Sequence, residues 1–317
     1  MSYPWLEAPM QALRQAYAAG RLPHALLIQD APGAGGAELA SWVAQLALCS
    51  GAEPRPCGGC SGCKRLESDQ HPDLIRIRPI EDSQQIRIEQ VRELGEGLAL
   101  TAHQGGYKVA ILEPADALNR FAANALLKTL EEPAPRTLLA LVAVQPSRLP
   151  ATILSRCQRI RVRPPTRAQS LEWLRQVRGE GAWESVLDLI GEAPLAAAGL
   201  DPRLIAELRR ETQQVLGETL AGRADVIGTA ERWSRTELPL RLACIENWLT
   251  ERIRRGCGVP ANAQEVRSGA HPRGGDSVMN TRALFQRLEQ VRELRAALAT
   301  PINRSLALES LLRSLQT

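Results

Sequence analysis

The chain has 317 residues, of which 44% are hydrophobic and 23% charged, and its 39 basic and 35 acidic residues give a net charge of only +4. This composition is typical of two or three globular domains, and the charge alone does not require a nucleic-acid partner. The longest apolar run, residues 138–144, is far shorter than the roughly 20 residues that cross a bilayer, and the first residues lack the features of a secretory signal, so we expect a cytoplasmic protein.

Short β-prone runs alternate with helical patterns through the first half of the chain. Runs typical of buried strands lie at residues 25–29, 74–78, 108–112, 138–144 and 158–163. Helical patterns lie at residues 37–48, 88–98 and 120–130. The last of these has Asn119 as a candidate N-cap, and its spacing predicts one buried face made by Phe121, Ala125, Leu126, Thr129 and Leu130. The alternation predicts a parallel, doubly wound α/β sheet.

A glycine-rich segment with the place and length of a phosphate loop follows the first predicted strand: Asp30-Ala31-Pro32-Gly33-Ala34-Gly35-Gly36-Ala37. A working loop ends in Lys and in Ser or Thr, which contact the phosphates and Mg²⁺, but Gly36 and Ala37 stand there instead. The backbone N–H groups that remain at the start of the helix are able to hold an anion weakly. The alternative is an ordinary strand-to-helix turn.

Four of the seven cysteines lie within fifteen residues: Cys49, Cys57, Cys60 and Cys63. Four thiolates at this spacing are typical of a tetrahedral, structural zinc site with no open coordination position. An iron-sulfur cluster of the ferredoxin type would need a fourth cysteine at position 67, where Glu67 stands. We expect zinc in a module at about residues 49–63, and the alternative is a set of unrelated buried thiols.

The third predicted strand ends at Glu113-Pro114-Ala115-Asp116. An ATPase would place an Asp for Mg²⁺ here, and often a Glu that orients the attacking water, and Pro114 does neither. Without these groups and without the lysine of the loop, we expect no ATP hydrolysis in this chain's own site.

After Pro164 and Pro165 the strand signal ends and helical patterns take over, including residues 170–177, 183–190, 238–254 and 281–298. Residues 258–276, rich in Gly, Pro, Asn and Ser, are expected to form a loop. We predict an α/β domain at 1–165, a small helical domain at 166–205 and a helical oligomerisation domain at 206–317.

Three segments, together with the cysteine cluster, resemble the bacterial clamp-loader AAA+ proteins: Arg21-Leu22-Pro23-His24-Ala25-Leu26-Leu27, Ala123-Asn124-Ala125-Leu126-Leu127-Lys128-Thr129-Leu130-Glu131-Glu132-Pro133 and Leu149-Pro150-Ala151-Thr152-Ile153-Leu154-Ser155-Arg156-Cys157. In that family the gamma/tau motor subunits keep a complete phosphate loop and one other subunit has a degenerate loop, which this chain resembles. The family's polar sensor falls at Val144 and its helical-domain arginine falls near Leu195, and both positions are apolar here.

The resemblance implies an AAA+ RecA-like domain, a helical lid and a helical collar. It implies that Arg156 is an arginine finger presented to the ATP of an adjacent motor subunit, since a planar guanidinium stabilises charge on transferring phosphate. The implied partners are the gamma/tau and delta subunits of DNA polymerase III, with the sliding clamp and primer-template DNA reached through the complex.

Two other functions are compatible with parts of the sequence. One is an autonomous AAA+ ATPase, which Gly36, Ala37 and Pro114 oppose. The other is a zinc-dependent nucleic-acid-binding module, although its cysteine insertion carries only Arg55, Lys64 and Arg65 as cations.

Overall fold

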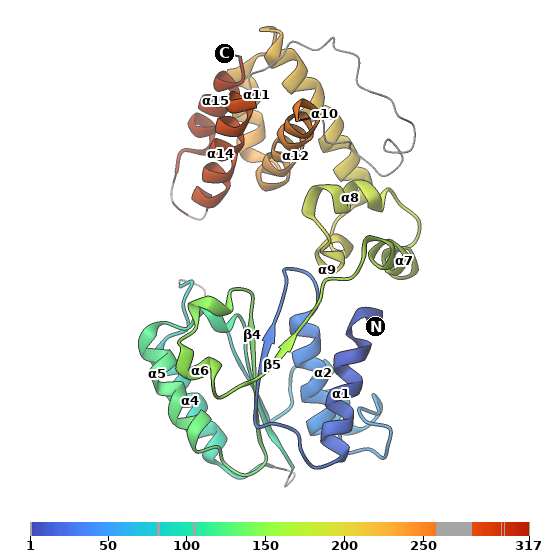
Figure 1. The fold of residues 1–317 in the computed structure, drawn as a ribbon, viewed down its shortest axis with the longest axis vertical. Helices are drawn as coiled ribbons and strands as arrows, with labels where there is room; N and C mark the ends of the chain where they lie inside the picture. Colours follow the sequence, from blue (N-terminus) through green and yellow to red (C-terminus); the bar gives the residue numbers. More distant parts are fainter. Residues whose placement is uncertain are drawn as a thin grey trace. The chain divides into compact units, whose positions relative to one another are not determined.

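The computed structural model describes residues 2–80, 83–103, 106–257, 281–298, 300 and 302–316. The chain divides into two compact units (Figure 1), the first made of Met1–Trp173 with Glu192–Leu195 and the second of Leu174–Gly191 with Ala196–Thr317. The three predicted domains, with a boundary near residue 205, stay a prediction. Along the described ranges, no helix combines the length and the apolar character needed to span a membrane.

A five-stranded parallel sheet forms the centre of the first unit, in the order β2-β3-β4-β1-β5. The strands are β1 (Ala25–Gln29), β2 (Leu74–Ile77), β3 (Lys108–Leu112), β4 (Thr137–Ala143) and β5 (Gln158–Arg161). Every residue of β3 and β4 is buried, because helices cover both faces of the sheet. The predicted α/β sheet is confirmed, with β4 starting one residue early and β5 ending two residues early.

Helices cover the two faces of this sheet (Figure 1). They are α1 (Glu7–Ala18), α2 (Gly36–Leu48), α3 (Ser61–Glu67), α4 (Ile88–Ala99), α5 (Arg120–Glu131) and α6 (Ala151–Leu154), with 3₁₀ turns η1 (Pro4–Leu6), η2 (Ala115–Ala117) and η3 (Pro146–Arg148). On one face α1 and α2 share a core with Leu26 and Ile28, and on the other α4 and α5 share a core with Ala25 and Leu27. This division follows from the alternation of side chains along a strand.

The predicted start of α5 is confirmed, but its buried face is only partly as expected. Asn119 caps the helix by accepting the N–H of Ala122 at 2.8 Å. The side chains buried on this helix are those of Ala122, Ala123, Leu126 and Leu130. Phe121 is 69% exposed, so its assignment to the core is wrong. It lies roughly 140° around the helix from Leu126, while the small alanines let the helix approach its neighbours closely.

After β5 the described residues form helices and connections. The helices are α7 (Arg167–Arg178), α8 (Trp183–Ile190), α9 (Pro194–Ala198), α10 (Pro202–Leu220), α11 (Val226–Arg235), α12 (Leu238–Gly256), α14 (Thr281–Ala297) and α15 (Arg304–Ser314). The predicted change from α/β to helical structure is confirmed within the described ranges. The predicted loop at 258–276 lies outside the described residues.

One polar contact joins three helices of the second unit. Glu211 on α10 accepts the indole N–H of Trp233 on α11 at 3.3 Å and pairs with the guanidinium of Arg241 on α12 at 2.9 Å. The Arg241 side chain is only 7% exposed and lies over the Trp233 ring, 4.8 Å from its centroid. Burial acts to raise the pKa of Glu211, but the hydrogen bonds from Arg241 and Trp233 outweigh it and hold the pKa below its ordinary value.

Candidate functional site

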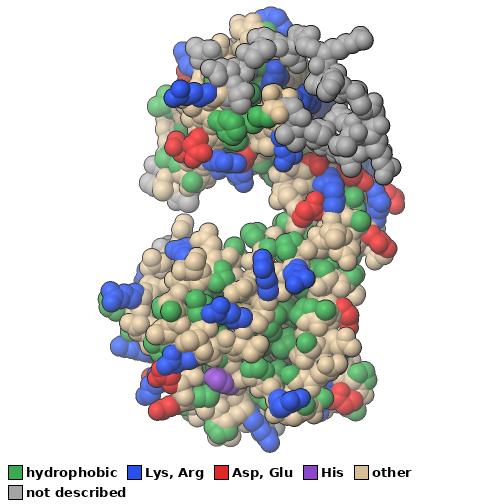
Figure 2. Space-filling view, viewed as in Figure 1, with side chains coloured by type: hydrophobic (Ala, Val, Ile, Leu, Met, Phe, Trp, Pro, Cys, Tyr) green, Lys and Arg blue, Asp and Glu red, His purple; other side chains and the backbone are tan. Residues whose placement is uncertain are grey.

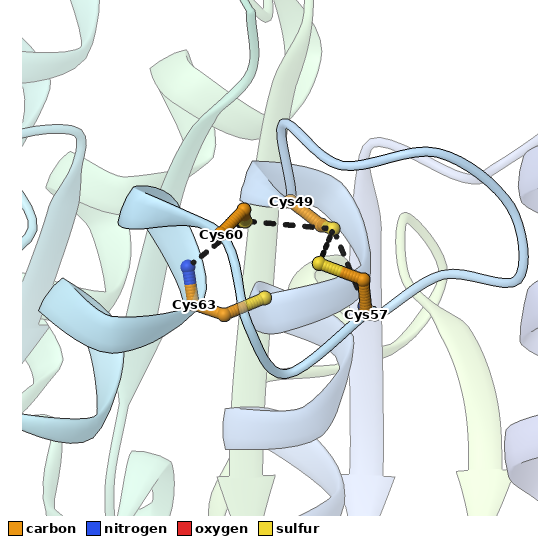
Figure 3. Close-up of side chains that lie close together, drawn as sticks. All are labelled: Cys49, Cys57, Cys60 and Cys63. Carbon is orange, nitrogen blue, oxygen red and sulfur yellow. Dashed lines mark hydrogen bonds between the residues drawn. The ribbon is translucent and has the colours of Figure 1, made fainter.

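The four clustered cysteines converge on one point of the first unit (Figure 3). Cys49 ends α2, Cys57 lies in the following loop, Cys60 caps α3 and Cys63 lies in the first turn of α3. Their four Sγ atoms all lie within 4.8 Å of one another, an arrangement that could hold a metal ion. The Sγ of Cys49 lies 3.5 Å from that of Cys57 and 3.8 Å from that of Cys60.

These separations fit a tetrahedral metal site. Zinc–sulfur bonds of about 2.3 Å place tetrahedral ligands about 3.8 Å apart, close to the two Sγ separations given above. Four sulfur donors fill such a coordination sphere, so a metal held here would carry no open position for a substrate. The donor set therefore suits a structural ion.

Glycines make the tight turns that bring these cysteines together. Gly58 has a φ of +70°, in the left-handed region that favours glycine. A Cβ added to Gly62 would lie 2.7 Å from the carbonyl oxygen of Leu48, and one added to Gly51 would lie 2.5 Å from the Sγ of Cys57. A larger residue would therefore collide with its neighbours at Gly51 and Gly62 and would be strained at Gly58.

Hydrogen bonds give the thiols unequal acidity. Burial acts to raise the pKa of Cys60, but hydrogen bonds from Ser50 and the backbone N–H of Cys63 outweigh it and lower the pKa to about 5. Burial and the hydrogen bond with Cys60 raise the pKa of Cys63 to about 12. The Cys60 sulfur is therefore better prepared to bind a cation than the Cys63 sulfur, which has to release its proton first.

The predicted phosphate loop connects β1 to α2 and has glycine-dependent backbone geometry. Gly33 has a φ of +72° and Gly35, the N-cap of α2, has a φ of +106°. Gly36 and Ala37 then begin the helix, where a working loop has its lysine and hydroxyl side chains. The loop thus keeps its glycines and its place in the fold but carries no cation or hydroxyl.

Residues of the first unit cover this loop. The indole N–H of Trp5 donates to the carbonyl oxygen of Ala34 at 2.6 Å. The Cβ of Ala193 lies 2.6 Å from the position that a Cβ of Gly33 would take, and the side chains of Leu6 and Leu195 lie 3.1 and 3.3 Å from that of Gly35. Leu195, where the resemblance puts an arginine, therefore contacts the loop with an apolar side chain.

Asp30, the first residue of the loop, was not singled out by the sequence. A Cβ added to Gly36 would lie 2.5 Å from the Cγ of Asp30 and 2.6 Å from its Cβ. The Oδ1 atom is buried and has no hydrogen-bond partner among the described residues. Burial raises the pKa of Asp30 to about 6, opposed by backbone hydrogen bonds from Gly36 and Ala31 and aided by the charges of Glu38 and Glu113. The sequence did carry a signal for this residue, because Asp30 stands where the phosphate-loop pattern has its first Gly.

The groups after β3 and β4 are committed to protein contacts. Glu113 pairs with Arg78 at 3.0 Å. The carboxylate of Asp116 accepts the backbone N–H groups of Val144 and Gln145 at 3.2 and 3.3 Å. Asp116 thus caps the end of β4.

Arg156 lies just after α6, on the exposed surface. Its guanidinium pairs with Glu131 at 2.7 Å and donates to the carbonyl oxygen of Thr152 at 3.0 Å. The two charged side chains are 37% and 50% exposed. The neighbouring Cys157 is buried, and burial raises its pKa to about 11, so this thiol suits packing and not reaction.

Lys and Arg side chains do not gather into one continuous patch on the face shown in Figure 2. They are scattered among acidic, apolar and uncharged surface. This face gives no sign of the basic track that proteins use to follow a nucleic-acid backbone.

Comparisons with known proteins identify relatives of this chain. A family model described as "DNA polymerase III, delta subunit" matches residues 5–166. The chain is 38% identical to the DNA polymerase III subunit delta' of Pseudomonas aeruginosa over 78% of this chain and 75% of that protein. It is 33% identical to the delta' subunit of Yersinia pestis over 99% of this chain and 95% of that protein.

More distant matches agree in fold. The chain is 34% identical to the DNA polymerase III subunit tau of Escherichia coli over 48% of this chain and 23% of that protein. A solved structure, a DNA polymerase III gamma subunit-related protein from Thermotoga maritima, matches 97% of this chain and 98% of its own with a TM-score of 0.52 and 19% identity.

Proposed function

Since the chain belongs to the delta' family of DNA polymerase III subunits, we propose that it works in the clamp loader without hydrolysing ATP itself and supplies Arg156 to the ATP site of a neighbouring subunit. The observation that carries this proposal is the contrast between two places in the first unit. The phosphate loop is filled and covered, whereas Arg156 is exposed and lies beyond the end of its helix.

The state of the loop supports the absence of ATP hydrolysis. Catalysis of phosphoryl transfer depends on positioning and on cations that offset developing charge. Here Gly36 and Ala37 replace the cationic and hydroxyl side chains, and the carboxylate of Asp30 adds negative charge where phosphates would have to enter. The side chains of Leu6 and Leu195 take up the space beside Gly35.

The setting of Arg156 supports a role in trans. An ion pair between side chains as exposed as those of Arg156 and Glu131 contributes about 0–1 kcal/mol, so the guanidinium leaves Glu131 at little cost. The γ-phosphate of ATP in a partner subunit would bind the planar guanidinium of Arg156 more strongly than Glu131 does, because charge-assisted bidentate hydrogen bonds are among the strongest. The partners in this proposal are gamma/tau and delta, with the sliding clamp and primer-template DNA reached through the complex.

The cysteine cluster takes a structural zinc ion in this proposal. Cys49, Cys57, Cys60 and Cys63 would hold it, which would join the end of α2 to the start of α3. Bound zinc would replace the thiol protons and fix a module that has few apolar contacts of its own.

The test is a reconstituted clamp loader that contains Arg156→Ala. We expect assembly, followed by gel filtration, to be unchanged, and hydrolysis at the one ATP site next to this chain to slow by about 10³-fold or more, seen as a lost fast phase in pre-steady-state ATPase assays with DNA. Arg159→Ala, an exposed arginine three residues away, is the matched control and should keep the fast phase. An unchanged fast phase in Arg156→Ala would remove the finger assignment.

The isolated chain provides the second part of the test. Saturable ATP turnover by the chain alone would show an autonomous ATPase. Tight, salt-dependent DNA binding by the chain alone would show a nucleic-acid-binding module.

A further inference from the structure

His71 is a buried histidine beside the cysteine module. It lies between α3 and β2 and is only 5% exposed. Its Nδ1 accepts the backbone N–H of Asp73 at 3.1 Å, and the carboxylate of Asp73 accepts the backbone N–H of His103 at 2.9 Å. These bonds fix the imidazole plane and leave the ring proton on Nε2.

The Nε2–H group of His71 is buried without a hydrogen-bond partner among the described residues. A buried donor left unpaired costs free energy, so such a group calls for an explanation. The packing of the ring against the module supplies one.

The Nε2 atom of His71 and the sulfur of Cys60 both lie beside Gly62. A Cβ added to Gly62 would lie 3.7 Å from the Nε2 of His71 and 3.7 Å from the Sγ of Cys60. Because Gly62 has no side chain, the imidazole nitrogen and the Cys60 sulfur both approach the same point beside its backbone. The backbone N–H of Cys63 already donates to the Cys60 sulfur at 3.4 Å, as the N–H of Cys57 donates to the sulfur of Cys49 at 3.4 Å. Cys60 is the one of these two acceptors that lies beside Gly62 and His71.

We propose that His71 is a positioning residue of the metal site, whose Nε2–H donates to the Cys60 thiolate when that sulfur holds a metal ion. This inference rests on the proposed zinc site. A hydrogen bond donated to a metal-bound sulfur orients that ligand and lowers the rate at which the metal is lost. The two hydrogen bonds that join His103 to Asp73 and Asp73 to His71 would then connect the cysteine module to the segment before β3.

Two substitutions separate the donor role from a purely structural one. His71→Gln keeps an N–H donor near the Nε2 position but loses the acceptor for Asp73. His71→Asn keeps an acceptor near the Nδ1 position but loses the donor. Zinc release from the purified full-length chain to an excess of a coloured chelator gives the rate for each.

We expect His71→Gln to release zinc within about threefold of the unchanged chain and His71→Asn to release it about 10–100-fold faster. The reverse order, with Gln faster than Asn, would assign His71 only the structural task of holding Asp73 and overturn the inference. Equal rates for all three would overturn it as well. If the unchanged chain binds no zinc, the metal site itself is wrong, and this outcome is distinguishable from the others.

A measurement without substitution covers the case in which a variant fails to fold. In the full chain loaded with ¹¹³Cd and labelled with ¹⁵N-histidine, the Nε2–H of His71 should exchange slowly with water and show a scalar coupling to the metal. A rapidly exchanging, uncoupled His71 proton in the loaded protein would contradict the proposed bond.

Discussion

Asp30 and Gly36 constrain each other at the start of α2. The Cβ of Asp30 lies 2.6 Å from the point that a Cβ of Gly36 would occupy, and a change of rotamer does not move that atom. The absence of the usual lysine side chain at position 36 is therefore coupled to the presence of a carboxylate six residues earlier. Restoring one position of the loop without the other would meet a steric conflict.

This coupling gives a prediction for Gly36→Ala. Helix propensity alone would favour alanine over glycine by about 1 kcal/mol, but the overlap with Asp30 should make the variant less stable than the unchanged chain by about 1–3 kcal/mol. In the background of Asp30→Gly, which removes the conflicting Cβ, the same substitution should be stabilising. Urea unfolding of the four proteins gives the comparison, and a destabilisation that persists in the Asp30→Gly background would contradict the coupling.

The residue scale also shows what the sequence could and could not reveal. The cysteine site was predicted because its four ligands lie close together along the chain, so spacing alone brings them into reach. The sequence did not predict that the phosphate loop is covered, because Leu6 and Leu195 are distant from Gly35 along the chain and lie beside it only in the folded structure. The same holds for His71, whose relation to Cys60 depends on the packing around Gly62.

At the scale of elements, prediction succeeded where one strong local signal acted. The patterns at β1 and β3 gave both ends of each strand, because four consecutive apolar residues in each one match the buried centre of a parallel sheet, with Gln29 and Lys108 as the polar residues at their ends. The helix α1 was missed. It contains Pro9, and proline normally indicates the end of a helix. Pro9 lies in the first turn of α1, where a helix tolerates a missing backbone N–H.

The contact between α10, α11 and α12 gives a prediction at this scale. Glu211→Gln would leave the buried guanidinium of Arg241 without its counter-ion, and we expect a loss of about 1–3 kcal/mol at pH 7. The control is Glu309→Gln, which removes an exposed pair with Arg313 along one helix and should cost about 0.5 kcal/mol or less.

The pH dependence of this effect has a definite sign. Because the pKa of Glu211 is lowered in the folded state, its contribution is fully present above the ordinary pKa of 4.5 and is lost as the pH falls through the lowered value. The difference in stability between the unchanged chain and Glu211→Gln, measured by thermal unfolding, should therefore narrow as the pH is lowered from 4.5 toward 2. A gap that stays constant over this range would count against the charge as its cause.

At the scale of the whole molecule, the two compact units have separate cores. The first unit has one core on each face of its sheet, and the second has a core of its own around Trp233 and Leu242. The cysteine module belongs to the first unit alone. Loss of a metal ion should therefore affect the two units unequally.

Hydrogen exchange before and after chelation tests this expectation. Removing zinc should lower the protection of α2 and α3 strongly and shift the unfolding of the first unit down by about 5–10 °C. The amides of α10, α11 and α12 should keep their protection. A uniform loss along the chain, or none, would contradict a site that stabilises the first unit only.

The groups that fill the phosphate loop are part of the polypeptide. Asp30, Leu6 and Leu195 are attached to the chain and have no dissociation equilibrium with the surrounding solution. Under the proposed function, occupancy at this position would consequently be independent of the cell's ratio of ATP to ADP. In the proposed clamp loader, neighbouring subunits that exchange nucleotide would follow that ratio, whereas this chain would offer them a surface that stays constant when the adenylate pool rises or falls.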